Sequence, residues 1–126
     1  MEHKIEVKIY YEDTDCLGIV YHANYLRYME RGRTEFFNYI GKPVWKLNEE
    51  GYNFVVYEMK IKFLKPARLG DVCRVTTMPS GKGSEFRKTI IHKIESNGQL
   101  LVDAEVDIIC LDKNRELRTF PTGIID

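Results

Sequence analysis

The sequence predicts an α+β domain in which one long helix packs against an antiparallel β-sheet of five to six strands. Between Tyr25 and Ile40, apolar residues recur with the period of a helix, whereas elsewhere apolar and polar residues alternate as in half-buried strands. The later segments are joined by short turns, which connect antiparallel neighbours because a parallel crossover needs about a dozen residues or more. A chain of 126 residues has room for one core, so we expect a single domain over positions 1–126.

The first two elements are a strand and the long helix. Alternation from Ile5 to Ile9 predicts the strand. The helix is expected to begin after Asn24, a favourable N-cap, and to end before Gly41, which gives it a length of about 24 Å. Its predicted apolar face consists of Tyr25, Tyr28, Met29, Phe36, Tyr39 and Ile40. Gly32 lies within this face, and because an interior glycine costs about 1 kcal/mol relative to alanine, we expect the helix to approach the sheet closely there.

The remainder of the chain returns to the period of strands. Alternation predicts four strands, at 57–63, 72–78, 86–95 and 102–110. Turn residues separate them at 65–71, 80–83 and 96–98. A short last strand is expected over 115–120, which would be the sixth.

Composition narrows the class of protein. The formal net charge is zero, so bulk electrostatics gives no argument for nucleic acid or an anionic membrane as the main partner. The three cysteines, Cys16, Cys73 and Cys110, are widely spaced without a CxxC pattern, which favours a reducing cytoplasm over a disulfide framework. No signal-peptide block follows Met1, and no apolar run is long enough to span a membrane.

The segment from Tyr11 to Tyr25 carries the chemistry. It places Asp13 and Asp15 at the end of a strand, then a turn at Gly18, then His22 where the helix begins. The first amides of a helix have no intrahelical partner and can stabilise a developing oxyanion, while a carboxylate opposite them can attack a carbonyl or activate water. We therefore interpret the segment as an active site for a carbonyl compound.

This segment resembles the signature of the 4-hydroxybenzoyl-CoA thioesterase family, specifically its YbgC-like acyl-CoA thioesterase branch. The similarity continues through Tyr28–Glu35 on the helix and through Phe63–Asp71. The resemblance implies the hotdog fold, in which an antiparallel sheet wraps a long central helix. It also implies a homodimer, commonly paired into tetramers, with active sites at the subunit interface. The implied activity is hydrolysis of an acyl-CoA without metal or other cofactor.

Carried over to this chain, the family's catalytic carboxylate corresponds to Asp15 and its backbone oxyanion donor to His22. Asp15 would act as general base or as nucleophile, and the sequence leaves both routes open. The His22 ring is expected to assist as well, and Asp13 is expected to hold the loop. The substrate-contacting residues expected in this segment are Gly18, Val20, Tyr21, Asn24 and Tyr25.

Coenzyme A carries phosphates, so basic residues and turn amides are expected near the mouth of the site. The residues we assign to this role are Lys62, Lys82 and Ser84, the last two within a Gly-Lys-Gly-Ser turn. His3, His22 and His92 have no recognisable ligand spacing, so no metal site is predicted.

Three other interpretations stay open at this level. Cys16 lies six residues before His22 and could be a nucleophile, although no third, orienting residue is evident. The enzyme could instead act on acyl-carrier-protein thioesters or be a hotdog dehydratase. A non-catalytic acyl-CoA-binding protein is the last alternative. The acyl chain that the protein prefers is not predicted.

Overall fold

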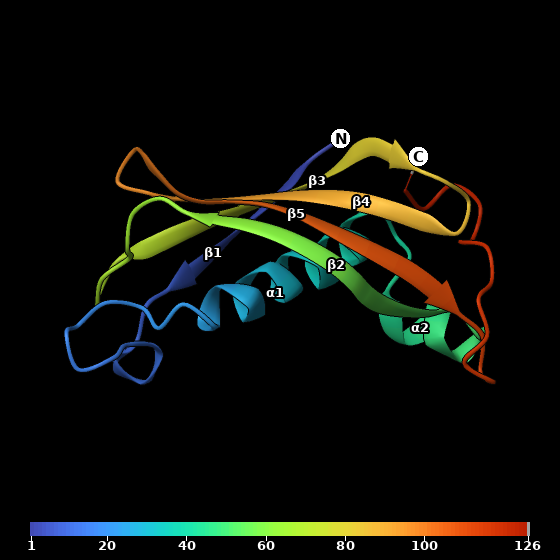
Figure 1. Ribbon diagram of the computed structural model, residues 1–126, viewed down its shortest axis with the longest axis horizontal. Helices are drawn as coiled ribbons and strands as arrows, with labels where there is room; N and C mark the ends of the chain where they lie inside the picture. Colours follow the sequence, from blue (N-terminus) through green and yellow to red (C-terminus); the bar gives the residue numbers. More distant parts are fainter. Residues whose placement is uncertain (126) are drawn as a thin grey trace.

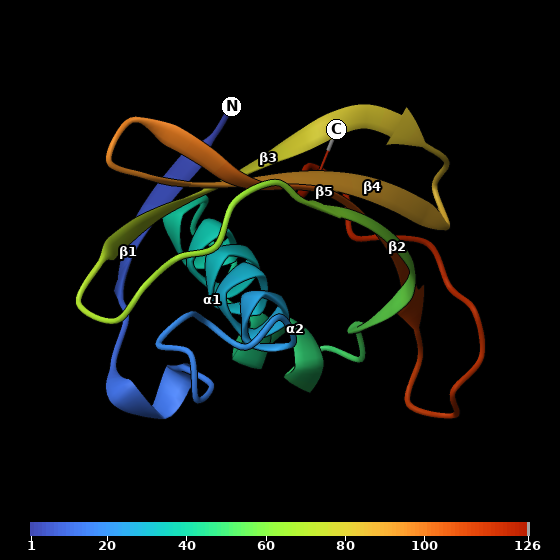
Figure 2. The same cartoon turned by 60° about the vertical axis from the view of Figure 1, so that its left-hand side comes forward.

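A computed structural model of the protein describes residues 1–125 and confirms the α+β architecture. The sheet has the strand order β1-β3-β4-β5-β2, and all neighbours are antiparallel. The strands are β1 (His3–Lys8), β2 (Asn53–Phe63), β3 (Val72–Gly83), β4 (Arg87–Ser96) and β5 (Gln99–Leu111). The sheet curves over one face of the long helix α1 (Asn24–Tyr39), as Figures 1 and 2 show. This is the arrangement of a hotdog fold.

The helices differ from prediction in two places. Ala23, and not Asn24, is the N-cap of α1, so Asn24 is already the first helical residue. A second, short helix, α2 (Val44–Glu49), occupies the stretch after the predicted helix stop. Pro43 is the N-cap of this helix, whereas α1 has already ended at Tyr39 with Ile40 as its C-cap.

Two predictions about the later strands are wrong. Residues 80–83 do not end a strand, because β3 continues to Gly83 with a register shift against β4 after Pro79. Residues 115–120 form no strand and contribute only an isolated bridge from Leu117 to Leu111. Arg115 has a φ of 65°, a left-handed conformation that interrupts an extended segment. The sheet therefore has five strands.

The helix approaches the sheet closely at Gly32, as predicted. A Cβ placed there would lie 2.5 Å from Oγ1 of Thr77 and 3.2 Å from Cγ1 of Val75, both on β3. Tyr39, which was predicted on the buried apolar face, is exposed instead. Its ring stacks on that of His3 at the surface, with the centroids 4.7 Å apart. Glycine at position 32 is thus required by the short distance between helix and sheet.

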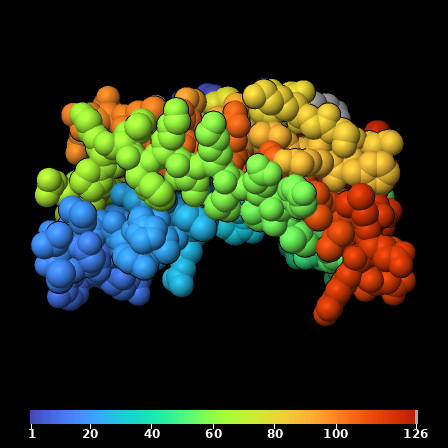
Figure 3. Space-filling model, viewed as in Figure 1, coloured from blue at the N-terminus to red at the C-terminus, as the bar shows by residue number. Residues whose placement is uncertain are grey.

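Buried apolar residues form two clusters, one toward each end of α1. The first contains Tyr25, Tyr28 and Met29 from the helix together with residues of β1, β3 and β5. The second contains an aromatic stack in which Phe54 lies between Phe37 and Phe120, at centroid distances of 5.2 and 5.5 Å. The two ends of the molecule project beyond the helix, so that the surface is hollowed between them (Figure 3). Within residues 1–125, no helix is long and apolar enough to cross a membrane.

Candidate active site

The loop that carries Asp15 is a small hairpin between β1 and α1. Asp15 donates its N–H to the carbonyl of Ile19 at 2.9 Å, and Tyr21 donates its N–H to the carbonyl of Asp13 at 3.0 Å. Gly18 turns the hairpin with a φ of 76°, a conformation that suits glycine, as predicted. The hairpin therefore fixes the position of Asp15 in space relative to the start of the helix.

A second segment supports this hairpin from its other side. Val20 donates its N–H to the carbonyl of Ala67 at 2.9 Å, and Leu69 donates its N–H to the carbonyl of Gly18 at 3.1 Å. The two arms of the hairpin and the segment 67–69 lie together at the end of the molecule where α1 begins, at the left of Figure 1. The family-like stretch around Ala67, far away in the sequence, is thus part of the same local structure.

The Asp15 carboxylate is half-buried and has one oxygen free of protein donors. Its Oδ1 accepts the Leu17 N–H at 2.8 Å in an Asx-type turn. Its Oδ2 accepts no hydrogen bond from residues 1–125. One oxygen therefore fixes the side chain, and the other is free for a water molecule or a substrate.

The start of α1 supplies free backbone donors. Within the described residues, the N–H groups of His22 and Ala23 donate to no protein acceptor, whereas Asn24 donates its N–H to the Tyr21 carbonyl at 2.9 Å. The His22 side chain is exposed, with its ring centroid 4.6 Å from that of Tyr21 and 6.0 Å from that of Phe63. These N–H groups are therefore available to an acceptor on a ligand.

Three of the residues predicted to contact substrate lie beneath this surface or serve the loop. Val20 and Tyr25 are only 4% and 3% exposed. The Tyr25 hydroxyl accepts the Ala67 N–H at 2.9 Å, and burial raises the pKa of this phenol. The Asn24 side chain donates to the Asp13 carbonyl at 2.9 Å. Val20, Asn24 and Tyr25 thus contact other parts of the protein. Gly18 and Tyr21 remain at the surface of the loop.

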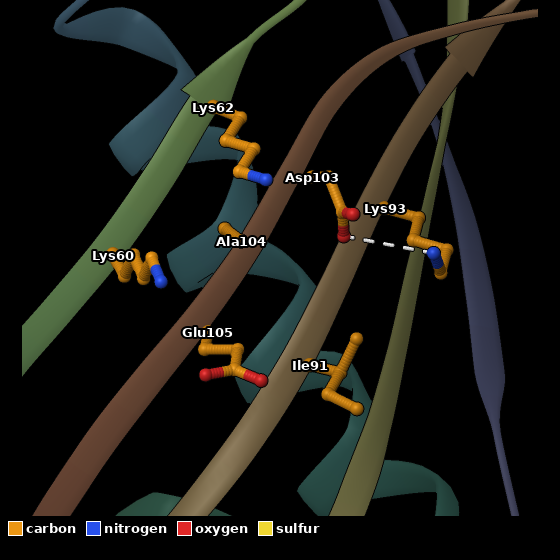
Figure 4. A pocket seen from close by; sticks show the side chains of 7 residues that line it. All are labelled: Lys60, Lys62, Ile91, Lys93, Asp103, Ala104 and Glu105. Atoms are coloured by element: carbon orange, nitrogen blue, oxygen red, sulfur yellow. Dashed lines mark ion pairs between the residues drawn. The ribbon is translucent and has the colours of Figure 1, made fainter.

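The predicted basic residues do not gather at one mouth within this chain. Lys62 lies on the outer face of the sheet, above a hollow that it shares with Lys60 and Lys93 (Figure 4). Asp103 faces the same hollow, 3.6 Å from Nζ of Lys93. Opposite charges therefore alternate across this face.

Lys82 and Ser84 lie even farther from Asp15. Lys82 lies at the far end of β3 and Ser84 directly after it, whereas the first residue of β3, Val72, is near the hairpin. Roughly 33 Å of extended chain therefore separate Lys82 from Val72. Nζ of Lys82 is 3.7 Å from Oε1 of Glu105. The expectation that these two residues frame the same mouth as Lys62 is not met within one chain.

A buried polar network under the middle of α1 was missed at the level of sequence. Arg33 is 6% exposed and donates from Nη1 to Nε2 of His92 at 3.0 Å. His92 is fully buried, and its Nδ1 lies 3.0 Å from Oγ1 of Thr77. Arg33 also pairs with Glu30 through Nη2. The one available signal was the position of Arg33 next to Gly32, at the edge of the apolar face.

Comparison with known proteins shows that the chain is similar to thioesterases. The profile of the "Thioesterase-like superfamily" matches residues 10–125. The chain is 36% identical over 123 residues to "Acyl-CoA thioester hydrolase YbgC" of Escherichia coli O6:H1, covering 94% of this chain and 90% of that protein. It is 51% identical over 84 residues to "Acyl-CoA thioesterase YbgC" of Helicobacter pylori, covering 67% of this chain and 58% of that one.

A solved structure gives the same answer for the fold. The crystal structure of a probable thioesterase from Bartonella henselae superposes with a TM-score of 0.89 at 32% identity, covering 96% of this chain and all of the other. The profile match takes in the Asp15 hairpin, both helices and strands β2 to β5. The chain therefore belongs to the thioesterase-like superfamily, and within it to the YbgC-like hotdog thioesterases.

Proposed function

We propose that the protein hydrolyses the thioester of an acyl-CoA to a free acid and coenzyme A. The names of the YbgC relatives support the activity. The observation on which the assignment depends is the Asp15 hairpin. On one short piece of chain it holds a carboxylate oxygen and the amides of His22 and Ala23, none of which has a partner among residues 1–125.

The chemistry requires little more than these groups. A thioester carbonyl is electrophilic and its thiolate leaves readily, so hydrolysis needs an activated nucleophile and stabilisation of the oxyanion. Asp15 either takes a proton from the attacking water or attacks the carbonyl itself to give an anhydride that water then opens. In both routes one water is consumed, the C–S bond breaks and the thiolate leaves as the thiol. An oxyanion donor such as the His22 amide would contribute roughly 2.7–4 kcal/mol.

The remaining site residues have distinct proposed roles. Gly18 and Tyr21 would line the site directly, with the exposed His22 ring beside the reacting group. Val20 and Tyr25 would shape it from below. Lys62 remains a candidate contact for a phosphate of coenzyme A, and Lys82 and Ser84 could serve the same ligand only from another subunit.

We further propose that the working unit is a dimer formed through β2. This strand is a free edge of the sheet, and its residues Val55, Val56 and Tyr57 are 42%, 40% and 59% exposed. In an antiparallel pair of β2 strands, the Asn53 end of one subunit would lie beside the Phe63 end of the other, next to His22. This arrangement would place a hollow between α1, α2 and β2 of one subunit beside the helix start of its partner. Dimers would pair further into tetramers, as the resemblance implies.

The dimer has its own test. Val55→Asp introduces a charge at the proposed interface and is expected to give a monomer in sedimentation and to lower kcat. Val72→Asp is the control, because Val72 is similarly exposed, at 49%, but lies on the interior strand β3. A Val55→Asp protein that stays dimeric and fully active would contradict the interface. We also propose a reducing cytoplasmic location, which is supported by three unpaired cysteines.

The activity is tested with Asp15→Asn, which keeps the acceptor oxygen of the Asx turn and removes the charge. We expect kcat to fall about 10³-fold or more on a panel of short, long and aromatic acyl-CoAs. The rate is measured from the release of free thiol. The matched control is Glu12→Gln, an exposed carboxylate in the same loop, which is expected to retain normal turnover. Near-normal turnover by Asp15→Asn would refute the assignment. Tight acyl-CoA binding without thiol release by the parent would favour a binding protein.

The two routes through Asp15 can be separated by isotope labelling. A single turnover in ¹⁸O-water, with enzyme in excess, is followed by mass spectrometry of the peptide that contains Asp15. If the carboxylate attacks and water then opens the anhydride at the aspartyl carbonyl, ¹⁸O enters the enzyme. Label in the product acid alone favours general-base catalysis, or an anhydride opened at the acyl carbonyl.

A further inference from the structure

The Asp13 carbonyl is a junction between the Asp15 hairpin and the helix. It accepts two hydrogen bonds, from the Tyr21 N–H at 3.0 Å and from Nδ2 of Asn24 at 2.9 Å. The first bond belongs to the hairpin. The second is a side-chain bond, partly buried, that spans eleven positions of sequence and ends on the first residue of α1.

The position of this junction relates it to the reacting groups. Asp13 lies two residues before Asp15, the proposed base or nucleophile. Tyr21 lies immediately before His22, the proposed oxyanion donor. One carbonyl oxygen therefore fixes the carboxylate and the helix amide relative to each other, and Asn24 holds that oxygen to the helix itself.

We propose that Asn24 is a positioning residue: its side-chain amide, through the Asp13 carbonyl, sets the separation between the Asp15 carboxylate and the His22 amide. This proposal rests on the proposed function. Asn24 does not touch the substrate in this role. It acts because a displacement of about 1 Å between reacting groups is enough to cost about 10²-fold in rate.

A second helical side chain, that of Tyr28, lies near Asp13 from the next turn. The Tyr28 hydroxyl is buried and has no hydrogen-bond partner within the residues that the structure describes. Burial and the nearby Asp13 carboxylate raise the pKa of this phenol, so the two side chains are close. The same carboxylate accepts the Tyr10 N–H at 2.8 Å. Asp13 is thus held by hydrogen bonds from Tyr10 before it, from Tyr21 of the hairpin and from Asn24 at the start of α1.

This arrangement differs from a helix cap or a substrate contact. As a cap, Asn24 would accept N–H bonds of its own first turn, but here its Nδ2 donates to another segment. As a substrate contact, it would need a free donor facing the ligand. Loss of a cap lowers stability and loss of a contact raises KM, whereas loss of positioning lowers kcat.

The first experiment compares Asn24→Ala with Asn38→Ala. Asn38 lies on the same helix and makes a bond of similar type, from Nδ2 to Oε1 of Glu35 at 3.3 Å, but at the exposed face. We expect Asn24→Ala to lower kcat about 10- to 100-fold with KM within about twofold, and Asn38→Ala to change neither. An unchanged kcat, or a loss entirely in KM, overturns the proposal.

The second experiment asks whether Asn24 acts through Asp15. Single-turnover rates are measured for Asp15→Asn, Asn24→Ala and the double variant, each with enzyme in excess. If positioning is the role, Asn24→Ala has little further effect once the Asp15 charge is gone. Equal fold-losses in the presence and absence of that charge overturn the proposal. A fully active Asp15→Asn protein instead refutes the proposed function, so the two failures are distinguishable.

Conservative variants keep the test valid if Asn24→Ala fails to fold. Asn24→Gln retains an amide donor on a longer stem and is expected to recover at least a third of the lost kcat, whereas Asn24→Asp places a carboxylate against the carbonyl and is expected to recover none. Thermal unfolding is recorded for each folded variant. Equal rates for the Gln and Asp variants would overturn the proposal.

Discussion

The first turn of α1 and its middle both carry polar side chains, but the two regions use them in opposite ways. At the first turn, the amides of His22 and Ala23 and one oxygen of Asp15 have no partner among residues 1–125. In the middle, Arg33 and His92 bond to each other in the interior. The open groups face a surface where a ligand can arrive, whereas the paired groups are closed off.

The difference shows where polarity serves chemistry and where it serves packing. A buried polar or charged group is costly unless it is hydrogen-bonded, so its partners must be complete within the protein. Groups that act on a ligand must instead leave hydrogen-bonding capacity unused. By this criterion the proposed site lies at the first turn, and the Arg33–His92 pair holds the helix to the sheet.

The largest effect expected on the middle of the helix is that of Gly32→Ala. The added Cβ would lie 2.5 Å from Oγ1 of Thr77, so helix or strand must move. We expect the free energy of unfolding in urea to fall by roughly 1–3 kcal/mol, with kcat per folded molecule little changed. Thr34→Ala, at an exposed position of the same helix, is the control. An unaltered urea midpoint for Gly32→Ala would show that the close approach does not matter.

A smaller effect should appear as a dependence of stability on pH. Burial, with a contribution from the Arg33 guanidinium, lowers the pKa of His92 to about 3 from an ordinary value of 6.5. Below pH 6.5 the unfolded chain binds a proton that the folded chain does not. Stability from this group is thus complete above pH 6.5 and falls by up to about 1.4 kcal/mol per pH unit toward pH 3.

The measurement is urea unfolding from pH 7.5 to 5, where the parent should lose about 2 kcal/mol through His92. In His92→Gln, which has no titrating ring, the slope over this range should be shallower by that amount. Parallel curves for the parent and variant would mean that His92 is protonated in the folded state, contrary to the closed network.

The contrast between the regions also explains what the sequence reveals. Gly32 was predicted from a local rule, because a glycine in an apolar helix face needs a reason. The Asp15 hairpin was recognisable because its residues are contiguous. The Arg33 network was not recognisable in the sequence, because Thr77 and His92 become cross-strand partners only through the register of β3 against β4. Such a pairing is set by the whole sheet.

Local rules also misassigned residues whose role depends on distant segments. Asn24 fits the N-cap preference, yet its amide is used by Asp13, eleven residues earlier. Lys82 and Ser84 belong to a glycine-rich segment of a type that can bind a phosphate. Because β3 is long and extended, they lie at the far end of the sheet. In both cases the residue type suggested a function and the topology decided whether it could be performed there.

The smallest effect expected concerns the His22 side chain, and it sharpens the comparison within the first turn itself. His22→Ala removes the exposed ring and keeps the backbone N–H, so the proposed oxyanion donor survives. We expect kcat to fall only about fivefold, equivalent to about 1 kcal/mol, with no change in the urea midpoint. Rates measured on the same acyl-CoA panel check this. A loss as large as that of Asp15→Asn would move the main role from the amide to the ring, and then the unpaired backbone would no longer distinguish this end of the helix from its middle.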